Sequence, residues 1–390
     1  MQHSQRIAAG LAVPASEQTA FAATQAVWRF LANDKVTPQR LIEPLQQFAK
    51  QQIDTGYVLH VFDWCKLHYK NHPSKQDCIS DCLKDGNGYD LTAQLAVNAD
   101  TGSPIAVVQA HLKTANGFLS TMNKVPKQDT PHLEQVLPMM KATTTMHLGG
   151  TPVFIIDREA DSVFYFRQWY DAKMLFLVRG DDDRRVDWQD KSVLMREIKM
   201  YADAGQKYIK SREIEFHGKV AEQYIFETNV TLSRPACRNV KDKRFSVAGE
   251  PLTLRLVIAE VVDATTQEEL ACWFLLTNVG EDVSSSTVAL WYYHRWRIES
   301  YFKLLKSGGQ ELEHWQQENG LAILKRLLVV SMGAAVVWSL QRSGSVEAAE
   351  FKRVLVRLSG KSQKRRRPPS AGTLLSGLFV LLRILTFWTR

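Results

Sequence analysis

The apolar residues in the first third of the chain form short runs that alternate with turn sequences. Tyr57–Phe62 is a β-rich apolar run that ends at Asp63. Leu91–Asn98 and Ile105–Leu112 alternate between apolar and polar residues, and the turn sequence 100–104 (Asp-Thr-Gly-Ser-Pro) lies between them. Alternation with a period of two is typical of strands, so these three runs predict a β-meander.

Further along the chain, strand-like and helix-like patterns alternate. Pro152–Ile156 is an apolar strand that ends at Asp157. Ser162–Ala172 has a helical pattern, and Leu175–Val178 is again a short apolar strand. Strands that alternate with helices predict an α/β core.

Both ends of the chain have helical patterns. Thr24–Phe48 predicts two helices, with Thr37 as the N-cap of the second and Pro38 at its first position. Three helices are expected near the C-terminus, at Ala322–Gln341, Ala348–Leu358 and Thr373–Trp388.

The middle of the chain has a charged segment followed by mostly strand-like runs. The charge run Asp181–Arg185 predicts a solvated loop. Ile209–Ile258 carries several strand-like runs separated by Gly, Pro and basic loops, and the strand Cys272–Leu276 follows. We therefore expect a β-rich insertion at 185–280, between core segments at 53–184 and 281–318, with helical regions at 1–52 and 319–390.

Composition narrows the class of protein. The formal charge of +8 and the pI near 9.1 favour an anionic partner such as nucleic acid. The five cysteines are scattered, which predicts reduced thiols and no disulfide framework. The apolar run Leu327–Leu340 is shorter than the roughly 20 residues that span a bilayer, so a buried helix and a cytoplasmic protein are expected.

One predicted helix carries the strongest chemical signal. At about 100° per residue, Tyr292, Arg295, Glu299 and Lys306 fall at about 0°, −60°, −20° and −40°. A carboxylate can hold a divalent cation, and flanking Arg and Lys can bind phosphates. An ordinary surface ion pair between Arg295 and Glu299 is the alternative that spacing alone leaves open.

The pattern Tyr292-x2-Arg295-x3-Glu299-x6-Lys306 resembles the signature of the DDE transposases of insertion-sequence family four. The resemblance implies a ribonuclease H-like catalytic core interrupted by a β-rich insertion, with Glu299 as a catalytic metal ligand. Family members often carry an N-terminal helical region that grips the transposon end. Ala26–Asn33 resembles an element that lies just before the catalytic core in the family. Only some twenty residues precede it here, so we expect the N-terminal region to be short or absent.

Two aspartates are candidates to complete the set of carboxylates. Asp157 ends an apolar strand, and the segment Asp157-Arg158-Glu159-Ala160-Asp161 resembles the second catalytic segment of the family, with Glu159 and Asp161 in supporting roles. Asp63 also follows an apolar run, but the chain has Asp63-Trp64-Cys65 where the family usually has Asp-Thr-Thr. Phosphoryl transfer on DNA suits two divalent ions about 4 Å apart, held by carboxylates. We expect Mg²⁺, with Mn²⁺ able to substitute, bound by Asp63, Asp157 and Glu299.

The resemblance also implies residues that hold DNA. Tyr292, Arg295 and Lys306 would anchor the transposon end, and Arg179 resembles another DNA-contacting position. Trp273 resembles a tryptophan that stacks on a base flipped out of the duplex, although a core tryptophan is an equal alternative.

The function implied is cut-and-paste DNA transposition. The protein would nick transposon ends by metal-dependent hydrolysis, form a hairpin intermediate and transfer the 3′-hydroxyl strand to target DNA. Expected partners are double-stranded DNA, in the form of terminal inverted repeats and target, and a second copy of the chain in a synaptic dimer. The alternatives are a catalytically idle DNA-binding regulator derived from a transposase and a non-transposing ribonuclease H-like nuclease.

Overall fold

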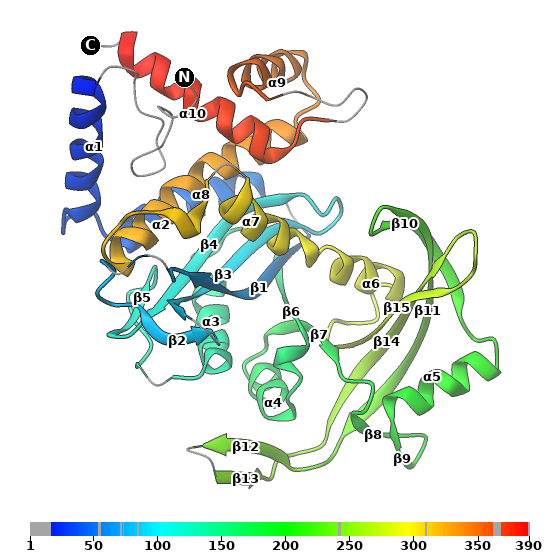
Figure 1. The fold of residues 1–390 in the computed structure, drawn as a ribbon. Helices are drawn as coiled ribbons and strands as arrows, with labels where there is room; N and C mark the ends of the chain where they lie inside the picture. Colours follow the sequence, from blue (N-terminus) through cyan, green and yellow to red (C-terminus); the bar gives the residue numbers. More distant parts are fainter. Residues whose placement is uncertain are drawn as a thin grey trace.

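A mixed β-sheet of thirteen strands organises the protein in the computed structural model (Figure 1). Most of its strands follow the order β5-β4-β3-β1-β6-β7-β15-β14-β11-β8-β9, while β2 pairs with β3 and β10 pairs with β11. A separate hairpin is formed by β12 and β13. The structure describes residues 17–388 apart from 54–55, 71, 73, 84–85, 129, 241–242, 309 and 362–367.

The bounds of the strands, in chain order, are as follows. The first part of the sheet contains β1 (Tyr57–His68), β2 (Ile79–Leu83), β3 (Gly86–Asn98), β4 (Pro104–Thr114), β5 (Gly117–Ser120), β6 (Thr151–Ile156) and β7 (Leu175–Gly180). The remaining strands are β8 (Arg185–Trp188), β9 (Lys191–Leu194), β10 (Ile209–Phe216), β11 (Lys219–Leu232), β12 (Ala236–Val240), β13 (Lys243–Val247), β14 (Leu252–Asp263) and β15 (Glu269–Thr277).

The α-helices surround this sheet. They are α1 (Glu17–Ala32), α2 (Pro38–Gln52), α3 (Val136–Met146), α4 (Val163–Asp171), α5 (Met195–Ala204), α6 (Ser285–Tyr293), α7 (Trp296–Ser307), α8 (Gly320–Arg342), α9 (Val346–Leu358) and α10 (Ala371–Trp388). Short 3₁₀ turns occur at η2 (His132–Gln135), η3 (Arg158–Ala160) and η4 (Leu312–His314).

The predicted meander is confirmed, because β1, β3 and β4 pair antiparallel in sequence order. The pair β1–β6 and the pair β6–β7 are parallel, as the alternation of strands and helices predicts. The helix after Asn33 also begins as predicted: Thr37 caps it by accepting a hydrogen bond from the backbone N–H of Arg40, and Pro38 follows at its first position.

Each face of the sheet has its own apolar core. Leu59, Val61 and Ile155 face one core together with apolar residues of α2, α7 and α8. Phe62 and Ile156, next to them in sequence, face the other core with residues of α3, α4 and α5. This alternation places helices on both faces (Figure 1), so the central strands are buried on both sides.

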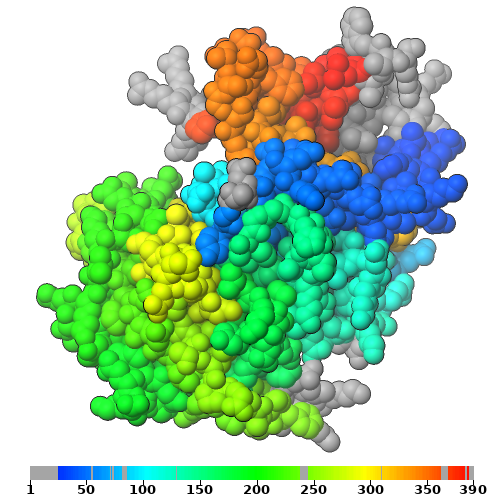
Figure 2. Space-filling view, turned by 180° about the vertical axis from the view of Figure 1, so that it is seen from behind, coloured from blue at the N-terminus to red at the C-terminus, as the bar shows by residue number. Residues whose placement is uncertain are grey.

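The segment expected to be a β-rich insertion is joined to the core by a continuous ladder of hydrogen bonds. Its last strand, β15, pairs antiparallel with β7 from Phe274 opposite Gly180 to Thr277 opposite Leu177. Viewed from behind, the N- and C-terminal helices form one end of the molecule and the strands of this segment form the other (Figure 2).

Among the described residues, α8 is the one helix long and apolar enough to cross a membrane by length and composition. In this structure 72% of its most apolar stretch of 18 residues is buried inside the protein. Two of its three cations are also buried: Lys325 donates to the carbonyls of Leu31 and Asn33, and Arg326 donates to the Gln317 side chain. The helix is therefore packed as a core helix, as its sequence predicts.

The buried histidines of the sheet predict sensitivity to acid. Burial lowers the pKa of His60 to about 3 and that of His111 to about 4. In the unfolded chain both rings take up protons below about pH 6.5. The stability that depends on the neutral rings is therefore complete above that pH and is lost as the pH falls toward 4.

For His111 alone the loss corresponds to about 3 kcal/mol at pH 4. Urea unfolding at pH 7 and pH 4.5 should show a smaller acid-induced loss for His111→Leu than for wild type. His314→Leu is the control, because the His314 side chain is 77% exposed. Equal losses in all three proteins would contradict the prediction.

Candidate active site

Asp63 and Asp157 occupy equivalent positions on two neighbouring parallel strands. Val61 of β1 lies opposite Ile155 of β6, and each aspartate follows two residues later. Side chains two residues apart on a strand point to the same face. Both aspartates therefore leave the sheet on the face that α7 covers, at the point where the β1–β6 pairing ends.

The two aspartates have different local surroundings. Asp157 ends β6 and caps η3, where its Oδ1 accepts a hydrogen bond of 2.7 Å from the N–H of Arg158. Asp63 was expected at the end of its strand, but β1 continues to His68 and Asp63 lies opposite Ala93 of β3. β1 continues because it still pairs with β3 after its pairing with β6 has ended.

The segment that carries Glu299 is not one continuous helix, which corrects the sequence analysis. α6 ends at Tyr293, and α7 begins at Trp296. Between them the chain makes tighter i→i−3 hydrogen bonds, from Arg295 N to Tyr292 O (2.9 Å) and from Ile298 N to Arg295 O (3.1 Å). We refer to residues 294–295 as the α6–α7 junction. The angles calculated for a single helix therefore do not apply. Tyr292, Arg295 and Glu299 nevertheless lie close together in the structure, around Asp157 and the Arg295 guanidinium.

The guanidinium of Arg295 is the centre of this convergence. It lies 3.6 Å from Asp63 Oδ2, 3.5 Å from Asp157 Oδ2 and 2.5 Å from Glu299 Oε1. The Arg295 side chain is only 7% exposed, whereas Glu299 is 40% exposed. One buried cation thus links a carboxylate of β1, a carboxylate after β6 and a carboxylate of α7.

Two further groups act on Asp157. The Tyr292 hydroxyl donates a 3.0 Å hydrogen bond to Asp157 Oδ1, and Arg179 Nε lies 3.1 Å from the same oxygen. Tyr292 and Arg179 were expected to hold DNA. In this structure both contact the Asp157 carboxylate, and their role in holding DNA stays a prediction.

The unequal surroundings separate the two aspartates electrostatically. Burial raises the pKa of Asp63 to about 6, although Arg295 and the N–H of Trp64 act in the opposite direction. Burial also acts to raise the pKa of Asp157, but Arg295, the N–H of Arg158, Arg179 and the Tyr292 hydroxyl together lower it. Asp157 is therefore the better-stabilised anion of the pair.

Lys306, the fourth residue of the signature, lies apart from the carboxylates that Arg295 links. Its Nζ donates a 2.8 Å hydrogen bond to the carbonyl of Lys66 and lies 3.1 Å from Glu313 Oε1. Glu313 in turn accepts a hydrogen bond from the backbone N–H of His68. Lys306 thus connects the end of α7 to the end of β1, a contact that sequence reasoning did not identify.

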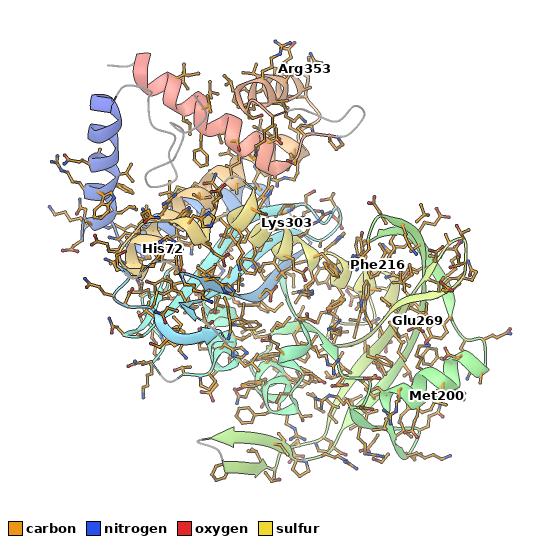
Figure 3. All side chains as sticks on the ribbon, viewed as in Figure 1. His72, Met200, Phe216, Glu269, Lys303 and Arg353 are labelled. Atoms are coloured by element: carbon orange, nitrogen blue, oxygen red, sulfur yellow. The ribbon has the colours of Figure 1, made fainter. Side chains whose placement is uncertain are left out.

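Trp273 lies in the core in this structure. It is 3% exposed, and its ring packs edge-on against Tyr292 at 5.4 Å and in a tilted arrangement against Phe216 at 6.1 Å between centroids. Figure 3 places Phe216 beside α6. This burial favours the core alternative for Trp273, and its role in base stacking stays a prediction.

The charged loop after β7 contains a buried ion pair that the sequence analysis missed. Arg184 Nε lies 2.6 Å from Asp161 Oδ1, with side chains 17% and 5% exposed. Asp161 also accepts a hydrogen bond from the N–H of Asp181, so it supports the local structure as expected. The prediction of a wholly solvated loop was wrong for Arg184, because a charge run does not show which member has a partner.

The same loop brings together the carboxylates of Asp181, Asp182 and Asp183, whose oxygens lie within 4.8 Å of one another. Asp181 pairs with Arg158 at 2.6 Å, and Asp183 pairs with Arg196. This cluster is more exposed than the Arg295 site, and arginines pair with two of its three carboxylates.

These carboxylates and cations define a site suited to phosphate chemistry, and the chain belongs to the transposase DDE domain family. The family match covers residues 84–332, which include Asp157, Glu299 and the signature cations but not Asp63. The chain is therefore a DDE transposase in its family membership.

Two solved structures are similar to the chain at a low level. The piggyBac transposase synaptic complex with hairpin DNA aligns with a TM-score of 0.36 and 10% identity, covering 93% of this chain. The chain spans 61% of the length of that protein. Endonuclease V from Bacillus subtilis aligns with a TM-score of 0.23 and 10% identity, covering 66% of this chain and 90% of that protein.

The central position of Arg295 predicts a large effect of its removal. In Arg295→Gln without divalent metal, three carboxylates lose their shared cation, and we expect the free energy of unfolding to fall by about 2 kcal/mol. Among the described residues Arg179 pairs with Asp157 alone, so Arg179→Gln should cost clearly less. Urea unfolding in EDTA measures both, and a larger loss for Arg179→Gln would contradict the prediction.

Proposed function

We propose that this protein is a cut-and-paste transposase of insertion-sequence family four. Asp63, Asp157 and Glu299 are its catalytic carboxylates for the cleavage and joining of DNA. The observation that carries the proposal is the convergence of these three carboxylates on one guanidinium. Membership of the transposase DDE domain family supports the reaction class. The signature residues Tyr292, Arg295, Glu299 and Lys306 support the narrower family.

The strand order supports a ribonuclease H-like core. β4, β3 and β1 form an antiparallel meander, and β6 and β7 continue it as parallel strands. We assign the core to these strands with α7, and we assign the β-rich insertion to residues 185–280. Asp63 then lies on β1 and Asp157 directly after β6, its parallel neighbour in the sheet. The helix α7, which covers this face, carries Glu299.

The donor set fits a divalent cation. Three carboxylates offer hard oxygen ligands, and the site already accommodates one positive group, the Arg295 guanidinium. Asp63, Asp157 and Glu299 would hold the ions, for which Mg²⁺ is the expected species. A divalent ion there would activate water or a 3′-hydroxyl and neutralise charge at the phosphorus.

The remaining residues would bind and orient the DNA end. Arg295 can contact a phosphate in bidentate fashion, and it can do so only by loosening its contacts with the carboxylates. Arg179 and Tyr292 present a guanidinium and a hydroxyl beside Asp157, close to where the scissile phosphate would lie. Lys306 would add a positive charge near the end of β1. A synaptic dimer on two inverted repeats belongs to the same proposal.

The proposal predicts separate effects on cleavage and binding for Glu299→Gln. The substitution keeps the shape and removes a charged ligand, so cleavage of linear DNA carrying the flanking inverted repeat should fall by more than about 100-fold. DNA affinity should stay equal or rise, because one negative charge near the phosphates is lost. Glu311→Gln is the matched control, since Glu311 is 67% exposed and pairs only with His314 among the described residues.

The outcomes separate the alternatives. Cleavage without joining by the wild type would identify a non-transposing nuclease. Binding of the repeat without cleavage would identify an idle regulator. Full cleavage by Glu299→Gln would refute the role of Glu299.

Metal binding can be tested without activity. Mn²⁺ should raise the melting temperature of the wild type, because a ligand of the folded state stabilises it by mass action. The rise should be larger in Arg295→Gln, where the ion no longer competes with the guanidinium. Asp157→Asn should abolish the rise. An undiminished rise in that variant would place the ion elsewhere, for example at Asp181–Asp183.

A further inference from the structure

The turn between β3 and β4 contacts the α6–α7 junction at close range. Gly102 has a φ of +65°, a conformation that favours glycine. A Cβ atom added there would lie 2.2 Å from Nδ1 of His294, far inside van der Waals contact. His294 is 5% exposed and immediately precedes Arg295. The backbone of the turn therefore packs directly against the residue next to the central guanidinium.

A second contact joins the turn to α7 on the other side of Arg295. Arg297 Nε donates a 2.7 Å hydrogen bond to the carbonyl of Gly102. The turn thus touches residues on both sides of Arg295, one by packing and one by a hydrogen bond.

The turn is well ordered by its own hydrogen bonds. Asn98 Oδ1 accepts from the N–H of Asp100 (3.1 Å), the N–H of Thr101 (2.8 Å) and the Thr101 hydroxyl (2.9 Å). Gly102 N–H donates to the carbonyl of Asn98 at 2.9 Å. Because Asn98 ends β3, which pairs with β1 along most of its length, the turn is fixed to the strand that carries Asp63.

The His294 side chain has fewer restraints than the backbone of the junction. Tighter i→i−3 hydrogen bonds hold the backbone at His294–Arg295, whereas neither ring nitrogen of His294 has a hydrogen-bond partner among the described residues. Packing against Gly102 is therefore a main constraint on where the His294 ring lies.

We propose that the turn Asn98–Ser103 positions the active site by fixing the α6–α7 junction, with Gly102 as its key residue. The proposal rests on the function assigned to the carboxylate site. The turn is fixed to the sheet that holds Asp63 and Asp157. Its contacts with His294 and Arg297 determine how far the segment that carries Arg295 and Glu299 lies from that sheet. A side chain at position 102 would push the junction away and lengthen the Arg295 contacts of 3.5 and 3.6 Å.

The first test is thermodynamic and needs no DNA or metal. In a double-mutant cycle, Arg295→Gln should destabilise the Gly102→Ala protein by less than half of what it costs the wild type, because the ion pairs are already weakened. Gly360→Ala is the matched control: Gly360 has a φ of +63°, and an added Cβ would meet nothing within 4 Å. In the Gly360→Ala background the cost of Arg295→Gln should be unchanged.

Rescue distinguishes a specific steric contact from general backbone strain. Gly102→Ala combined with His294→Ala removes the ring that the methyl group would meet, so the cost of Arg295→Gln should return toward the wild-type value. Should Gly102→Ala fail to fold, Arg297→Met removes the hydrogen bond to the Gly102 carbonyl without adding an atom to the turn. It should also reduce the cost of Arg295→Gln.

The second test measures the chemistry. On repeat DNA, Gly102→Ala should lower the single-turnover cleavage rate by about 10- to 100-fold with little change in DNA affinity, since small misplacements of catalytic groups are costly. Additive effects in the cycle, or absence of rescue by His294→Ala, would overturn the positioning role. Absence of cleavage by the wild type with an intact cycle would refute only the proposed function.

Discussion

The compensation of three carboxylates by one buried guanidinium is the constraint on which the rest of this structure depends. Carboxylates that lie close together repel one another, and their burial adds a desolvation cost. Arg295 offsets the repulsion and the desolvation cost, because its buried guanidinium contacts one oxygen of each of the three carboxylates. The helix is interrupted at this residue, since α6 ends at Tyr293 and α7 begins at Trp296.

The surrounding fold positions the three carboxylates in two ways. Parallel pairing places Asp63 and Asp157 side by side, and the packing of α7 on the same face brings Glu299 over them. Tyr292 lies in the last turn of α6 before the break. Its ring packs against Trp273, and its hydroxyl donates a hydrogen bond to Asp157. A residue expected to anchor the transposon end thus packs in the core of this structure.

The sequence predicts the parts of this site that depend on local pattern. A strand ending at Asp157, a meander before it and the cap at Thr37 each leave a signal within a few residues. The break at His294–Arg295 leaves no such signal, because it contains neither proline nor glycine. The length of β1 beyond Asp63 depends on pairing with β3, and the Asp161–Arg184 pair joins two distant loops. The roles of the site residues themselves remain proposals.

The antiparallel pairing of β15 with β7 has a consequence for how the chain folds during synthesis. β7 emerges early and then waits with an open hydrogen-bonding edge until Glu269–Thr277 has been made. An unpaired apolar edge invites association with other chains. Throughout that interval the nascent protein depends on protection from aggregation, and a chain interrupted within residues 185–268 would keep this edge open.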